Sequence, residues 1–70
     1  MTPTVGRIVH VFGSPESKTP MAAIVCAAHS ETCINVFVWD PNGGTFARTS
    51  VLRRDQPGVQ GTCWDWPAKA

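Results

Sequence analysis

Short apolar runs rich in β-branched residues alternate along this chain with clusters of glycine, proline, asparagine, aspartate and serine. The best candidate for a helix is the alanine-rich stretch 21–29, but the β-branched residues Ile24 and Val25 stand at its centre. Because the neighbouring segments alternate with the period of a strand, the pattern predicts an all-β chain without a helix of useful length.

Turn-forming residues divide the chain into five expected strands. The strands are predicted at residues 5–12, 21–27, 33–39, 45–52 and 61–67, and Pro67 closes the last segment. The connections are polar loops at 14–20 and 53–60 and tight turns at 29–32 and 40–44, where Asn42-Gly43 suits the positive φ angles of a hairpin. This order predicts a small five-stranded barrel of the SH3-like or Tudor-like type, in which closure protects the strand edges.

The strand at 33–39 has two different faces. One face holds Ile34, Val36 and Val38, and the other holds Cys33, Asn35, Phe37 and Trp39. Because Asn35 is polar, we expect the first face to line the core and the second to face outward. Phe37 and Trp39 would then be large apolar side chains near water, which need a functional reason.

The segment 61–67 holds two of the three tryptophans, Trp64 and Trp66, two residues apart. In an extended segment, residues i and i+2 lie on the same side, so the pair would form a double aromatic platform. Such a platform closes a core, seals a subunit interface or stacks on a ligand. Joined to Phe37 and Trp39, it would form one aromatic patch.

The length of 70 residues and the formal net charge of +1 fit one small globular domain. A core of this size contributes about 3–5 kcal/mol, so we expect the chain to form a homo-oligomer. The near-zero charge gives no long-range attraction to nucleic acid or to an anionic membrane. Because the chain shows no signal peptide and no apolar run near the roughly 20 residues that span a bilayer, we expect a cytoplasmic protein without a membrane partner.

The sequence does not support catalysis. Its carboxylates are Glu16, Glu31, Asp40, Asp55 and Asp65, and most of them lie in predicted loops. No two are placed together for acid–base chemistry, and the nucleophile motif G-x-S-x-G and a Walker-type phosphate loop are absent. We therefore expect a non-enzymatic protein.

A metal or other cofactor is not expected either. The possible zinc ligands are Cys26, His29, Cys33 and Cys63, which could in principle make a tetrahedral site. Two of the cysteines lie inside predicted strands, and the paired C-x-x-C geometry is missing. An odd number of cysteines also argues against a disulfide framework, so we interpret the thiols as small apolar residues.

The candidate ligand-binding residues combine aromatic rings with cations. Guanidinium groups hold phosphate and indoles stack on bases, so together they suit a nucleotide. The candidate set is Trp39, Trp64, Trp66, Arg7, Arg48, Arg53, Arg54 and His10. Two structural explanations compete: the arginines near residue 53 are solvated loop residues that pair with Asp55, and His10 is a hydrogen-bonded strand residue.

Four motifs in this order resemble a group of small phage and prophage proteins. They are VGRIVH at 5–10, AAIV at 22–25, DPNGG at 40–44 and, after Gly61-Thr62, WDWP at 64–67. The pattern of that group runs VGRIVHY, AAIV, a valine-rich strand with P-x-G, and WHWP, so the resemblance covers nearly the whole chain. Val11 stands where the group often has tyrosine, and Asp65 stands where it often has histidine.

The resemblance implies a phage-encoded accessory protein that acts in the host cytoplasm. Since some small phage β-proteins sequester nucleotide second messengers between subunits, the first functional hypothesis is a binding module that sequesters a nucleotide-derived immune signal as a homo-oligomer. The alternatives are a protein-interaction module that inhibits a host protein, a nucleic-acid-binding small barrel, and a structural piece of the virion.

Overall fold

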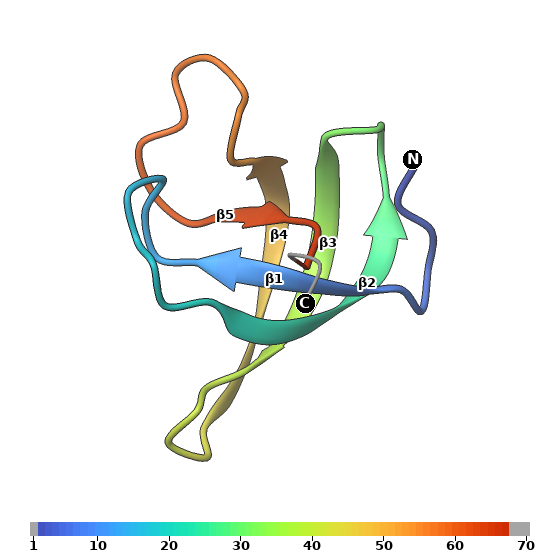
Figure 1. Cartoon of the computed structure of the whole chain (residues 1–70). Helices are drawn as coiled ribbons and strands as arrows, with labels where there is room; N and C mark the ends of the chain where they lie inside the picture. The colour runs from blue at the N-terminus through green and yellow to red at the C-terminus, as the bar shows by residue number, and fades with distance from the viewer. Residues whose placement is uncertain (1, 68–70) are drawn as a thin grey trace.

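A computed structural model describes residues 2–67, and it confirms the all-β prediction. The strands are β1 (Ile8–Phe12), β2 (Met21–Ala28), β3 (Cys33–Trp39), β4 (Thr45–Arg53) and β5 (Cys63–Asp65). They follow one another around a closed barrel, in which every neighbouring pair is antiparallel except β4 with β5 (Figure 1). The described residues include no helix that is long and apolar enough to cross a membrane.

The strand boundaries differ from the prediction where the backbone turns. β3 has the predicted limits, and β2 and β4 each extend one residue further. The first strand begins at Ile8 rather than at residue 5. Gly6 has a φ of +93°, and its N–H donates to the Val25 carbonyl, while the Val25 N–H donates to the Arg7 carbonyl. Because two adjacent residues bond to one residue of β2, the regular ladder begins only after them. The segment 61–67 contributes only the three residues of β5.

Alternate residues of the strands fill the barrel. The buried core cluster consists of Val9, Val11, Ala23, Val25, Ile34, Val36, Val38, Val51 and Trp64. This result confirms the prediction that the Ile34 face of β3 lines the core and that the Asn35 face looks outward. Most of the cluster is valine, so one large side chain, Trp64, fills the volume that the short β-branched residues leave.

Trp64 joins three parts of the barrel. Its side chain is 0% exposed, and its Nε1–H donates a hydrogen bond of 2.9 Å to the carbonyl oxygen of Thr32 in the β2–β3 turn. The same carbonyl accepts a 2.8 Å bond from the Arg53 N–H at the end of β4. The ring edge also meets Trp66, with 5.3 Å between centroids. Trp64 therefore closes the core, and the prediction that it offers a ring face to a ligand is corrected.

A bulge bends β4 in its second half. The register between β3 and β4 shifts between Ile34 and Val36, so Asn35 faces an additional residue of β4. Ser50 lies in this bulge with a φ of +53°, and its N–H donates a 2.9 Å bond to the Asn35 Oδ1. Because a bulge bends a strand and increases its twist, it separates the β4 residues before Ser50 from those that pair with β5.

The turn between β3 and β4 is confirmed, although its geometry differs from the expected one. The Gly43 N–H donates to the Asp40 carbonyl at 2.9 Å, and the Asp40 N–H donates to the Gly44 carbonyl at 2.7 Å. Gly43 has a φ of +101°, whereas Asn42 does not have a positive φ. The Asp40 Oδ1 accepts a 2.7 Å bond from the Asn42 N–H, so the carboxylate organises the turn.

We expect Trp64→Ala to unfold the protein. Removing a buried tryptophan side chain costs about 3–5 kcal/mol, which is similar to the whole stability of a core this small. Urea titration followed by circular dichroism should show no folded baseline for this variant. Leu52→Ala is the control, because Leu52 is 39% exposed and lies outside the core cluster. A wild-type unfolding midpoint for Trp64→Ala would contradict the assigned role.

Candidate functional site

The outer surface of the barrel carries two rows of cross-strand neighbours. One row runs from β1 to β4 through Ile8, Ile24, Phe37 and Ala47. The other runs in the same direction through His10, Ala22, Trp39 and Thr45. Since the residues between these positions along the strands point into the core, both rows face outward.

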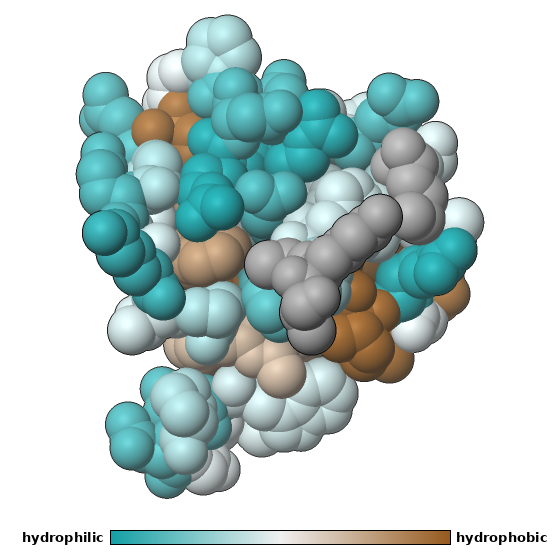
Figure 2. Space-filling model, viewed as in Figure 1, coloured by the Kyte–Doolittle hydropathy of each residue, from teal (hydrophilic) through white to brown (hydrophobic). Residues whose placement is uncertain are grey.

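The apolar members of these rows form one continuous surface. We call it the outer apolar face, and it consists of Ile8, Ala22, Ile24, Phe37, Trp39 and Ala47. Ile8 is 53% exposed and Trp39 is 43% exposed, while Ile24 and Phe37 are half-buried. In Figure 2, brown and tan apolar surface lies in the region where β1 and β2 run in Figure 1. Four strands spaced as in an ordinary sheet make this face about 14 Å wide.

Two aromatic side chains of the outer apolar face contact each other. The rings of Phe37 and Trp39 meet edge to face, with 5.2 Å between centroids and 80° between planes. The Phe37 ring packs against one side of the indole, and 43% of Trp39 stays exposed. A supported indole loses little conformational freedom when a partner covers it, which suits an anchor residue.

Three of the predicted ligand-binding residues lie on or beside this face. Trp39 belongs to it, His10 stands in the same row on the far side of Ala22, and the exposed Arg7 directly precedes Ile8. His10 also meets the Phe12 ring edge to face at 6.5 Å. The structure therefore places the Trp39 indole on this face and the His10 imidazole two strands away in the same row. Within residues 2–67, the Arg7 guanidinium makes no cation–π contact with either ring.

The predicted single aromatic patch is not formed. Phe37 and Trp39 lie on the outer side of the sheet, whereas Trp64 belongs to the core cluster and Trp66 packs against that cluster as a partly buried residue. Trp66 remains half-buried near the barrel interior together with Met21 and Phe46. The four aromatic residues therefore divide between two sides of the sheet.

Arg53 and Arg54 are held by carboxylates. The Arg53 Nε lies 2.8 Å from the Asp55 Oδ1, and this hydrogen bond lowers the pKa of Asp55. The Arg54 guanidinium lies 3.2 Å from Asp65 and 4.2 Å above the centre of the Phe12 ring. For Arg53, the structure agrees with the expected pairing with Asp55, and neither guanidinium is directed at Trp39.

Arg48 and Asp65 also have contacts within the barrel. Arg48 lies 4.5 Å above the centre of the Phe46 ring and donates to the Ala47 carbonyl. Asp65, which stands where the resembled proteins often have histidine, holds Arg54 and accepts a 2.8 Å bond from the Trp66 N–H. Arg48, Arg53 and Arg54, which are close in sequence, thus have separate contacts and do not converge on one ligand position.

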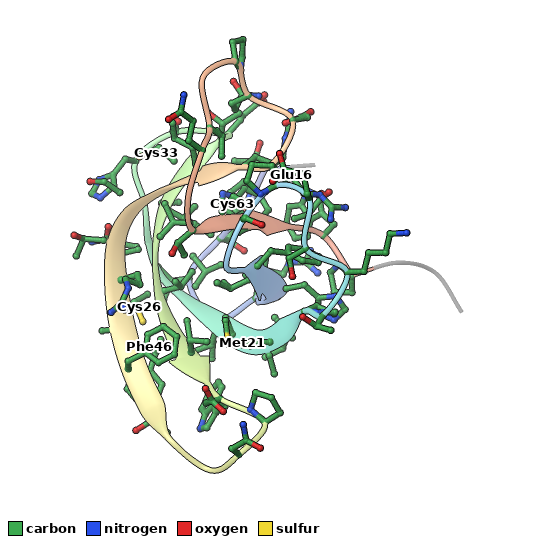
Figure 3. All side chains as sticks on the ribbon, turned by 90° about the vertical axis from the view of Figure 1, so that its left-hand side faces the viewer. Glu16, Met21, Cys26, Cys33, Phe46 and Cys63 are labelled. Atoms are coloured by element: carbon green, nitrogen blue, oxygen red, sulfur yellow. The ribbon has the colours of Figure 1, made fainter. Side chains whose placement is uncertain are left out.

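The possible zinc ligands do not assemble. Within residues 2–67, no group of three or more histidine, cysteine, aspartate or glutamate residues could hold a metal ion. Figure 3 shows Cys26, Cys33 and Cys63 on different strands. Cys26 is exposed and Cys63 is buried, and burial raises the pKa of the Cys63 thiol above its ordinary value.

Most of the outer apolar face could not be recognised along the sequence. Ile8, Ile24 and Ala47 belong to three strands, and only the register brings them beside Phe37. The signal that was present is the apolar character of both faces of β2, where inward Val25 alternates with outward Ile24. A strand that is apolar on both faces indicates either burial on both sides or a binding surface.

Comparison of the chain with protein-family models, curated proteins and solved structures gives no match. The resemblance to small phage proteins therefore stays a prediction.

We expect the cysteines to react with an alkylating reagent in the order of their burial. Cys26 should be modified at once, whereas Cys63 should react at least about 100-fold more slowly, because a buried thiol of raised pKa reacts through unfolding. Time-resolved iodoacetamide labelling with peptide mass spectrometry measures both rates. A Cys26→Ser variant serves as the control that identifies the fast site. Equal rates for the two thiols in native buffer would show that β5 is not held in the barrel.

Proposed function

We propose that this protein is a non-enzymatic interaction module that binds another protein through the outer apolar face. The observation that carries the proposal is the row of apolar neighbours across four strands, with Ile8 53% and Trp39 43% exposed. A continuous apolar surface of this kind on a small folded protein marks an interaction site. Its size suits the apolar centre of an interface, with the surrounding polar residues as a rim.

The charges around the face favour a protein over a nucleic acid. The outer apolar face contains no charged residue. Nucleic-acid binding depends on several cations that neutralise phosphates, whereas Arg53 and Arg54 are engaged with carboxylates. The partner surface that fits is apolar at its centre and polar at its rim.

Trp39 is the proposed anchor. Tryptophan is enriched among interface residues that contribute most of the binding energy, and such residues lie at the centre of a surface that excludes water. Trp39 is flanked by the small side chain of Ala22 on β2 and by Thr45 on β4, so a partner can cover its ring from both sides.

A second candidate is nucleotide binding, and the exposed indole of Trp39 supports it. In this arrangement a base would stack on Trp39 above Ala22, with His10 beyond it in the same row. If the chain is encoded by a phage, as the sequence resemblance implies, protein binding would inhibit a host protein. Nucleotide binding would instead sequester an immune signal.

We expect a photo-crosslinking amino acid at Ile8 to capture one specific protein from an extract of the cells that contain this chain. The same group placed at Leu52 is the matched control, because Leu52 is also an exposed apolar strand residue but lies outside the outer apolar face. With the captured protein purified, Trp39→Ala should weaken binding by about 30-fold or more, as expected for an anchor residue. Isothermal titration measures this change.

Two results would contradict the docking proposal. One is unchanged affinity of the Trp39→Ala variant for the captured protein, and the other is equal crosslinking from Ile8 and Leu52. Native mass spectrometry of the freshly purified protein distinguishes nucleotide binding from protein binding. A bound mass that absorbs near 260 nm and disappears in Trp39→Ala would support a nucleotide instead.

A further inference from the structure

Half of β4 has a strand neighbour on one side only. β4 pairs with β3 from Thr45 onward, but it pairs with β5 only at Leu52 and Arg53. Within residues 2–67, no strand lies against the other edge of residues 45–49. Figure 1 shows this part of β4 extending with β3 beyond the place where β5 crosses. A strand edge of this kind presents a row of peptide groups that can pair with another strand.

The hydrogen-bond pattern shows which peptide groups lie on this edge. Asp40 and Gly44 bond to each other across the β3–β4 turn. Residues of an antiparallel pair alternate between bonding to the partner and pointing away from it. Counting from Gly44, the N–H and C=O groups of Thr45, Ala47 and Thr49 therefore point toward the edge.

We propose that this edge pairs with the same edge of a second copy of the chain. The two β4 strands would run antiparallel around a two-fold axis at Ala47, and the barrel sheets of the two copies would continue into each other. In this register Ala47 faces the partner's Ala47, and Thr45 faces the partner's Thr49. Phe46 then faces the partner's Arg48.

The sequence of the edge is complementary to itself in this register. The alanines at the centre let the two backbones approach, and paired threonines stabilise neighbouring strands. Arg48 lies 4.5 Å above the Phe46 ring within one chain. In the dimer, the same cation–π contact could form between Arg48 of one copy and Phe46 of the other. No like charges face each other, and the formal net charge of +1 gives little repulsion between copies.

The edge lacks most of the features that prevent strand pairing. Residues 45–49 contain no proline, glycine or lysine, and the bulge at Ser50 comes only after them. The one charged side chain, Arg48, shares the side of β4 that carries Phe46, which packs against the core. Natural sheets protect free edges with prolines, bulges or charges along the edge, so an unprotected edge on a very small domain favours association.

Pairing across Ala47 would also join the outer apolar faces of both copies. The row that ends at Ala47 would continue into the same row of the partner, so the apolar surface would extend over eight strands instead of four. The proposed dimer does not depend on the docking proposal, because Trp39 takes no part in the pairing of the two β4 strands.

The first test is the oligomeric state of Ala47→Pro. Proline removes the central edge N–H from each copy but no bond to β3, because the Ala47 N–H points away from that strand. We expect sedimentation equilibrium to show a wild-type dimer and a dissociation constant raised by about tenfold or more in the variant. Trp39→Ala is the matched control, which should remain dimeric. A wild-type protein that stays monomeric up to millimolar concentration overturns the proposal, as does a variant that dimerises normally.

Cysteine scanning keeps the test valid if Ala47→Pro does not fold. In a Cys26→Ser, Cys33→Ser background, Ala47→Cys should form a disulfide-linked dimer under mild oxidation, because facing residues of such a pair are about 5.5 Å apart at Cα. Thr45→Cys should not, since its copies would be separated by roughly 13 Å along the strands. A mixture of the Thr45→Cys and Thr49→Cys proteins should crosslink with each other. Equal crosslinking at positions 45 and 47 contradicts the two-fold register.

Discussion

The closure of the barrel around Trp64 is the interaction on which the rest of the structure depends. A core of valines leaves a volume that only one large side chain can fill, and the indole fills it with no exposed surface. Its hydrogen bond to the Thr32 carbonyl ties β5 to the β2–β3 turn, and the Arg53 N–H uses the same carbonyl. A strand of three residues can therefore complete the barrel, because the buried Trp64 side chain and its hydrogen bond add to the few backbone bonds of β5.

This way of closing the barrel determines which surfaces remain open. Because β5 is short, it reaches β4 only beyond the bulge at Ser50, and the earlier part of β4 keeps a free edge. Arg54 and Asp65 then hold the β4–β5 junction from outside, with Phe12 beneath the guanidinium. Arg53 and Arg54, which were predicted to hold phosphate, thus contact carboxylates at the end of the barrel, and the proposed partner surface lies on β1, β2, β3 and the first half of β4.

The sequence predicted those features that depend on local pattern. The limits of β3, its inward Ile34 face and the exposure of Trp39 followed from alternation, from the polar Asn35 and from the turn after Asp40. Features that depend on contacts distant in sequence were not predictable. The burial of Trp64 requires the β1–β5 pairing, and the outer apolar face requires the register of four strands. Trp64 and Trp66 have the spacing of a surface pair, and only closure decides that one of them is internal.

The apolar residues on the outside of the sheet lie apart from the core cluster. The core cluster is complete without Ile8, Ile24 or Phe37, and none of these side chains contributes to it. In a domain whose core contributes about 3–5 kcal/mol, an exposed apolar surface favours association. Their place on the sheet supports a binding role, because the row that they form leads to Ala47 at the open edge of β4. One element, the β3–β4 hairpin, therefore carries both the proposed anchor Trp39 and the open edge proposed to pair with a second copy.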